Sequence, residues 1–161
     1  MVVPNGARDG LPGGRAMARG YAARLGRRRS LRPVVVERRG SVIAGRGLFA
    51  TEGIARGERV DVDAELLNHS CDPTLAWSAD GAGLEAFRDL SAGEELTVDY
   101  ATSSADPDML VRCHCETYRC RQMVTGDDWQ IPQVQRRYAG HFAPSVQSLV
   151  DRTLGQPHSS S

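Results

Sequence analysis

Three short segments of the chain decide its interpretation: NHSCDP at residues 68–73, GEELTVDY at residues 93–100 and CHCETYRC at residues 113–120. The second segment is rich in apolar and β-branched residues after a turn signal, so it predicts a strand that ends at Tyr100. The third places three of the chain's four cysteines within eight residues, in the pattern C-x-C-x4-C. Cysteines crowded in this way, in a chain without an export signal, favour a metal site over disulfides.

The cysteine spacing predicts a structural zinc site. Cys113, Cys115 and Cys120 supply three thiolates from one tight loop, and tetrahedral zinc needs one more ligand. Cys71 is the remaining cysteine and the predicted fourth ligand; His114 is the alternative, although neighbouring residues rarely direct both side chains at one metal. Four reduced, buried cysteines are a further alternative, but charged residues surround the cluster and argue against an apolar pocket. Four protein ligands leave no open position, so the predicted zinc is structural.

The remaining pattern predicts short strands followed by helix. Residues 34–64 contain four strand-like runs separated by glycine or turn residues: VVVER, SVIAG, GLFAT and ERVDVDA. Residues 84–90 and 96–100 flank the turn-rich SAGE and predict an antiparallel hairpin. Pro144 and the apolar residues that follow it at helical spacing predict a C-terminal helix, and a shorter helix is expected near Pro132. The fold class is therefore mainly β with a C-terminal helix.

Four segments in this order resemble the SET domain with its post-SET zinc loop: GRGLFA at residues 45–50, NHSC at 68–71, ELTVDY at 95–100 and CHCETYRC at 113–120. The resemblance covers about residues 34–125, and TGDDWQIPQVQRRYAGHF is similar to the tails of short bacterial members. It implies a SET-like fold of short strands with a knot-like crossing. It also implies a protein-lysine N-methyltransferase that uses S-adenosyl-L-methionine.

The resemblance assigns roles to six residues. The expected cofactor-binding residues are Gly45, Arg46, Gly47, Asn68, His69 and Tyr100. Glycines without a Cβ allow the backbone to approach a ligand, and the amide and imidazole groups can bind the adenine edge and nearby backbone. Tyr100 is also the expected catalytic residue, because the matching hydroxyl in the family lies beside the transferring methyl group and orients the lysine amine. Alone, each of these features is typical of an ordinary turn, loop or core tyrosine.

The chain is expected to divide into four parts: a disordered, arginine-rich head at residues 1–33, a SET-like domain at 34–105, a post-SET zinc loop at 106–125 and a helical C-terminal segment at 126–155. Within the second part, residues 54–67 are much shorter than the segment that family members carry there. In those members this segment forms one wall of the groove for the substrate peptide. The alternative function is therefore a catalytically impaired SET-like, zinc-binding interaction module.

The distribution of charge suggests the partner. All 20 basic residues are arginines; residues 1–39 hold ten of them against two acids, and the remainder holds ten against 18 acids. The acidic body favours a basic protein substrate. The basic head is a weaker indication of nucleic-acid binding than of a solvated tail. Residues 1–32 lack the apolar core of a secretory signal and no apolar run is long enough to span a membrane, so a cytoplasmic protein without membrane contact is expected.

Overall fold

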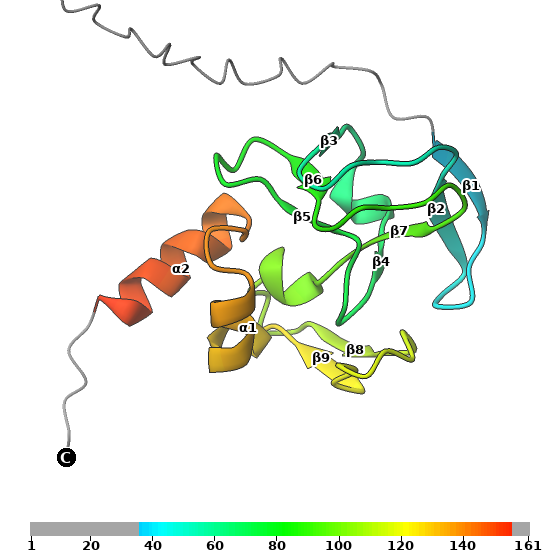
Figure 1. Cartoon of the computed structure of the whole chain (residues 1–161). Helices are drawn as coiled ribbons and strands as arrows, with labels where there is room; N and C mark the ends of the chain where they lie inside the picture. Colours follow the sequence, from blue (N-terminus) through cyan, green and yellow to red (C-terminus); the bar gives the residue numbers. More distant parts are fainter. Residues whose placement is uncertain (1–35, 156–161) are drawn as a thin grey trace, which may run out of the picture.

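A computed structural model describes residues 36–155 of the chain, and its strands form two small sheets and one hairpin (Figure 1). The four-stranded sheet has the order β1 (Val36–Gly40), β2 (Arg46–Ala50), β7 (Glu95–Val98) and β4 (Asn68–His69). The three-stranded sheet has the order β3 (Arg59–Val60), β6 (Leu84–Ala86) and β5 (Leu75–Trp77). The hairpin pairs β8 (Leu110–Arg112) with β9 (Met123–Thr125). The mainly β fold class is as predicted.

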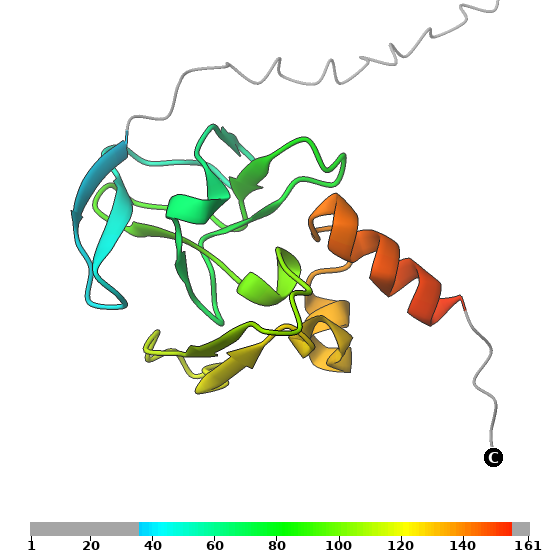
Figure 2. The ribbon, with the colours of Figure 1, turned by 180° about the vertical axis from the view of Figure 1, so that it is seen from behind.

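Helices are short and concentrate after the last strand. Three single turns, η1 (Ala64–Leu66), η2 (Tyr100–Thr102) and η3 (Asp128–Gln130), precede α1 (Pro132–Arg137) and α2 (Pro144–Leu154). Both predicted helices are confirmed, and each begins at a proline, whose fixed φ and missing N–H suit a first helical turn. Figures 1 and 2 show these helices on the side of the molecule opposite the β1–β2 hairpin.

Strand β7 lies in the interior of the larger sheet and sets the position of the later segments. It pairs antiparallel with β2, with Leu96 opposite Leu48, and parallel with β4, with Val98 opposite His69. β7 ends at Val98 and not at Tyr100 as predicted, because Asp99 caps the turn η2 that begins at Tyr100. The parallel pairing brings residues 68–69 beside this end of β7. Two segments of the sequence that carry the predicted site therefore meet in space.

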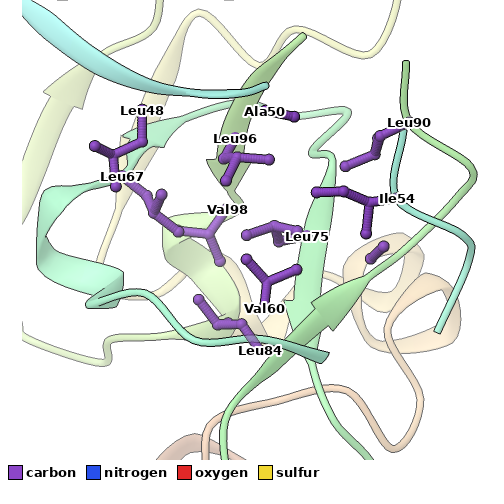
Figure 3. Close-up of a cluster of buried hydrophobic side chains, with 11 residues drawn as sticks. Leu48, Ala50, Ile54, Val60, Leu67, Leu75, Leu84, Leu90, Leu96 and Val98 are labelled. Atoms are coloured by element: carbon purple, nitrogen blue, oxygen red, sulfur yellow. The ribbon is translucent and has the colours of Figure 1, made fainter. Parts of the chain in front are cut away.

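Two hydrophobic clusters hold the elements together. The first lies between the two sheets, and Figure 3 shows Leu75, Val60 and Val98 among its side chains. The second joins α1 and α2 to η2 through Tyr138, Phe142 and other buried apolar residues. Because both clusters bury side chains almost completely, they fix η2 between the sheets and the C-terminal helices.

Two further sequence predictions are wrong. Residues 41–45, SVIAG, form the β1–β2 hairpin loop instead of a strand: Val42 is 98% exposed, Gly45 has φ of 47°, and the Ile43 amide donates to Ser41 Oγ. Residues 84–90 and 96–100 do not form a hairpin, because β6 pairs with β3 and β5 whereas β7 pairs with β2 and β4. Alternation of apolar residues fixes which face of a strand is buried but not its partner.

Other predicted elements are partly confirmed. The GLFAT run lies largely within β2, but only Arg59 and Val60 of ERVDVDA form a strand. Val34, Val35, the predicted head at 1–33 and the last six residues lie outside the described part of the chain. Domain boundaries and the knot-like crossing stay predictions. No helix within residues 36–155 is both long and apolar enough to cross a membrane.

Candidate functional site

The four cysteines come together as predicted. Their Sγ atoms all lie within 4.8 Å of one another, and those of Cys71 and Cys113 are 3.8 Å apart. A tetrahedral zinc ion with Zn–S bonds of about 2.3 Å separates its sulfur ligands by about 3.8 Å. His114 is exposed and is not part of this group. The donor set and its spacing therefore fit one four-coordinate zinc ion.

Local backbone geometry directs amide groups at the sulfur atoms. Cys71 follows β4 and Cys113 follows β8, and the intervening turns need positive φ at Glu116 and Gln122. Backbone amides of residues 115, 121 and 122 donate to the sulfurs of Cys113, Cys71 and Cys120, at 3.3–3.4 Å. Amide donors stabilise thiolates, so the loop is built to hold sulfur in its anionic form.

Burial opposes ionisation of two of these thiols when no cation is present: it raises the pKa of Cys71 to about 11 and raises the pKa of Cys113 as well. Burial also opposes ionisation of Cys115, but hydrogen bonds, first of all with Thr117, outweigh it and lower the pKa of that thiol to about 6. A divalent metal reverses the effect of burial, because it binds the thiolate directly and supplies positive charge where water is excluded.

Contacts at the backbone amide, the hydroxyl and the ring hold Tyr100 in place. Its backbone amide donates to His69 Nδ1 at 3.1 Å, its hydroxyl donates to the carbonyl of Leu67 at 2.9 Å, and its ring centroid is 5.1 Å from that of His69. Burial raises the pKa of the Tyr100 hydroxyl, so this group remains protonated at neutral pH. The Tyr100 hydroxyl is therefore neutral and held in a fixed position by the Leu67 carbonyl.

His69 connects Tyr100 to the cysteine cluster. Burial lowers the pKa of this histidine to about 4, so the ring is neutral at pH 7. Because Nδ1 accepts the Tyr100 amide, the ring proton is on Nε2, which lies 3.2 Å from Cys71 Sγ and can donate to it. The same side chain therefore contacts the strand end on one side and a predicted metal ligand on the other.

Asn68 and the GRG segment form a second small network. The Asn68 side-chain amide donates to the Ala44 carbonyl at 3.0 Å and to Glu95 Oε1 at 2.7 Å, with a longer contact of 3.4 Å to the Arg46 carbonyl. A Cβ on Gly47 would lie 2.2 Å from Glu95 Oε1. The Glu95 carboxylate would have to move to admit this atom, so Gly47 leaves room for a side chain that is hydrogen-bonded to Asn68.

Tyr100 lines two recesses. A narrow one of about 50 Å³ is lined by residues that include Ala44, Asn68, His69 and His114. A wide one of about 900 Å³ contains Asp63, Glu65, Trp77, Met109 and Pro144 in its lining. Of the predicted cofactor residues, Asn68, His69 and Tyr100 line the narrow recess, whereas Gly45, Arg46 and Gly47 are not among its lining residues. Ile43 and Ala44 line it instead, and their loop had been predicted as a strand.

Comparison with known proteins identifies the central segment. Residues 60–101 match the family model described as SET domain. This matched segment of the chain is similar to a SET domain. The match begins at β3 and ends within η2, so it includes Asn68, His69, Cys71 and Tyr100 but stops before the cluster's other three cysteines.

The curated proteins that are similar to this chain are named as methyltransferases. The chain is 34% identical over 93 residues to Drosophila melanogaster histone-lysine N-methyltransferase ash1, covering 52% of this chain and 4% of the relative. It is 40% identical over 66 residues to the probable histone-lysine N-methyltransferase set-23 of Caenorhabditis briggsae, covering 37% and 27%. A third relative, Fusarium mangiferae histone-lysine N-methyltransferase, H3 lysine-9 specific KMT1, is 33% identical over 94 residues, covering 43% and 27%. The chain thus spans about a quarter or less of these relatives.

A solved structure is similar to a lower degree. The crystal structure of KRYPTONITE in complex with mCHG DNA and SAH aligns with a TM-score of 0.45 and 20% identity, covering 56% of this chain and 29% of that one.

Gly47→Ala tests the packing beneath Asn68. The new Cβ would displace the Glu95 carboxylate, which also accepts from Ser41 Oγ at 2.8 Å, so we expect a loss of about 1–3 kcal/mol in the free energy of unfolding. Gly40→Ala is the matched control, because a Cβ there meets nothing within 4 Å. Denaturant unfolding of both variants measures the difference. Equal stabilities would show that Glu95 moves without cost and that Asn68 is not held by it.

Proposed function

We propose that the chain transfers a methyl group from S-adenosyl-L-methionine to a lysine amine of a basic protein. The observation that carries this proposal is the position of Tyr100 between the narrow recess and the wide acidic one. A methyl transfer needs the sulfonium and the amine on opposite sides of one point, aligned with the methyl group between them. Tyr100 lies where such a point would be, with its hydroxyl held against the Leu67 carbonyl.

The narrow recess is the proposed cofactor side. The exposed imidazole of His114 and the side-chain oxygen of Asn68 can hydrogen-bond a nucleoside, whereas both ring nitrogens of His69 are already engaged by Tyr100 and Cys71. Its volume of about 50 Å³ is far below the roughly 300–1,000 Å³ of typical ligand pockets. We therefore expect the 41–45 loop or residues 112–114 to move outward when the cofactor binds.

The wide recess is the proposed substrate side. The charged residues in its lining, Asp63 and Glu65, are both acidic and both exposed. Trp77, Met109 and Pro144 add apolar surface on which the methylene groups of a lysine can pack. This combination favours a lysine within a basic segment of protein. Histone-lysine methyltransferase relatives support the same kind of substrate.

The short 54–67 segment still contributes a wall to this recess. Residues 62–65, around η1, line it on one side, and residues 143–145, at the start of α2, also take part. The Ala143 amide donates to the Thr102 carbonyl at 2.8 Å, which fixes the start of α2 to the turn that contains Tyr100. The C-terminal helix therefore supplies surface that the shortened segment lacks.

Tyr100 would orient the nucleophile. When bound, S-adenosyl-L-methionine would supply the reactive methyl group, and the lysine amine would be the group that receives it. Lysine, with a usual pKa of about 10.4, must first lose a proton. The protein's part is alignment of the neutral amine, for which a fixed, protonated hydroxyl is suited.

Zinc is the proposed structural metal. Its four cysteine ligands would join residue 71, after β4, to the segment 113–120, and they leave no coordination position open for water. Because Cys71 also accepts from His69 in this arrangement, the metal would support the floor of the narrow recess as well as the loop.

Cys71→Ser tests the zinc site. We expect one zinc per chain in the parent and a loss of metal affinity of at least about tenfold in the variant, since even changes outside the ligand shell cost about 10–100-fold. His114→Ala is the matched control and should keep the metal, because His114 is outside the cluster. Metal analysis with chelator competition measures both. Full zinc retention in Cys71→Ser would remove Cys71 from the ligand set, and an absence of zinc from the parent would remove the site.

Tyr100→Phe tests the catalytic assignment. The variant keeps the ring but loses the hydroxyl, so we expect methyl transfer to fall about 10²–10³-fold while cofactor affinity changes little. Tyr118→Phe, at an 82% exposed position, is the control. The measurement is transfer from labelled cofactor to lysine-rich proteins; the chain itself contains no lysine. A variant as active as the parent would make Tyr100 a packing residue, and a parent without transfer to any protein would favour the interaction-module alternative.

Asp63→Asn with Glu65→Gln tests the substrate side. Asp63 accepts from the Glu65 amide at 2.9 Å, and asparagine can keep this cap while removing the charge. Each exposed ion pair contributes up to about 1 kcal/mol, so we expect KM for a basic peptide to rise roughly three- to tenfold with kcat unchanged. Glu37→Gln, on β1, is the control. A KM that does not change would place the substrate elsewhere.

A further inference from the structure

Arg121, directly after the last cysteine, makes the most heavily bonded ion pair near Tyr100. Its Nη1 and Nη2 donate to the two carboxylate oxygens of Asp99 at 2.8 and 2.6 Å, and its Nε donates to Asp128 at 2.8 Å. The Arg121 side chain is 18% exposed, while that of Asp99 is fully buried. A planar guanidinium can make this parallel pair of bonds, whereas an ammonium group cannot.

Asp99 is also the residue that begins the turn containing Tyr100. Its side chain accepts from the Ala101 amide at 3.1 Å and thereby caps η2, while its carbonyl accepts from the Thr102 amide and hydroxyl. His69 Nδ1 lies 3.7 Å from Asp99 and accepts the Tyr100 amide, so that atom does not donate to Asp99. The Asp99 carboxylate accepts two hydrogen bonds from Arg121 and one from the Ala101 amide, so Arg121 contributes most of the contacts that orient it.

We infer that Arg121 is a positioning residue for Tyr100: it holds Asp99, Asp99 caps the turn, and the turn sets the direction of the Tyr100 hydroxyl. The expected effect on kcat rests on the proposed methyl transfer. The expected effect on the orientation of Tyr100 does not. Backbone contacts extend the arrangement to the cysteine cluster, since the Arg121 amide donates to Cys71 Sγ at 3.3 Å. Asp128, which accepts from Arg121 Nε, is itself held by hydrogen bonds from the backbone amide and the hydroxyl of Thr125.

The kinetic test is a pair of substitutions in two backgrounds. Arg121→Lys keeps the charge but loses the paired hydrogen bonds. Displacement of an aligned catalytic group by about 1 Å can cost about 10²-fold, so we expect kcat to fall by that order while KM for the cofactor is unchanged. In the Tyr100→Phe background the same change should cost no more than about threefold, because the hydroxyl it positions is already gone. An equal loss in both backgrounds would overturn the inference.

A readout independent of activity separates this inference from the proposed function. The chain has four tyrosines, and ¹³C labelling of their rings gives signals that Tyr100→Phe assigns. We expect Arg121→Lys to shift or broaden the Tyr100 signal with zinc content retained. Arg88→Lys, the same exchange in an exposed pair with Glu94, should leave it in place. If Arg121→Lys does not fold, Asp99→Asn, which removes the charge Arg121 binds, should shift the same signal. An unchanged Tyr100 signal in a folded variant would overturn the inference even if the parent shows no methyl transfer.

Discussion

The parallel pairing of β4 with β7 is the constraint on which the rest of the structure depends. It places His69 opposite Val98, two residues before Tyr100, although the two strands lie far apart in the sequence. Because His69 then reaches the Tyr100 amide and Cys71 follows two residues later, one pairing brings together the strand end, the imidazole and the first cysteine. Without it, the narrow recess and the cysteine cluster would each lose a wall.

Burial gives these groups their chemical state. A histidine that is 4% exposed stays neutral, so it can accept from one neighbour and donate to the other. Burial raises the pKa values of Cys71 and Cys113, whereas Asp99 forms an ion pair with Arg121 at its buried position. The cysteine cluster and the Tyr100 turn are therefore connected through residues 69, 71 and 121.

Short sequence motifs predicted the cysteine cluster and the start of the C-terminal helix. C-x-C-x4-C requires a fourth ligand, and Cys71 was the cysteine left to supply it; Pro144 predicted the start of α2. Sequence motifs did not predict features that depend on a residue far away in the sequence. Residues 41–45 read as a strand because of Val42 and Ile43, yet they close a hairpin loop. The pairing of Asp99 with Arg121, 22 residues apart, had no signal beyond the position of each beside a motif residue. Asp63 and Glu65 likewise gained a role only when α2 enclosed the same recess.

The proposed methyl transfer requires Tyr100 to separate a cofactor recess from a substrate recess. The most direct measurement is a crystal structure of the zinc-loaded protein with S-adenosylhomocysteine, the product that remains after the methyl group is transferred. We expect the nucleoside to lie between the 41–45 loop, Asn68 and His114, with the ligand's sulfur directed toward the Tyr100 hydroxyl and the recess of Asp63 and Glu65 still open. Binding of the nucleoside in that wide recess, or at a place not in contact with Asn68 and His69, would contradict it.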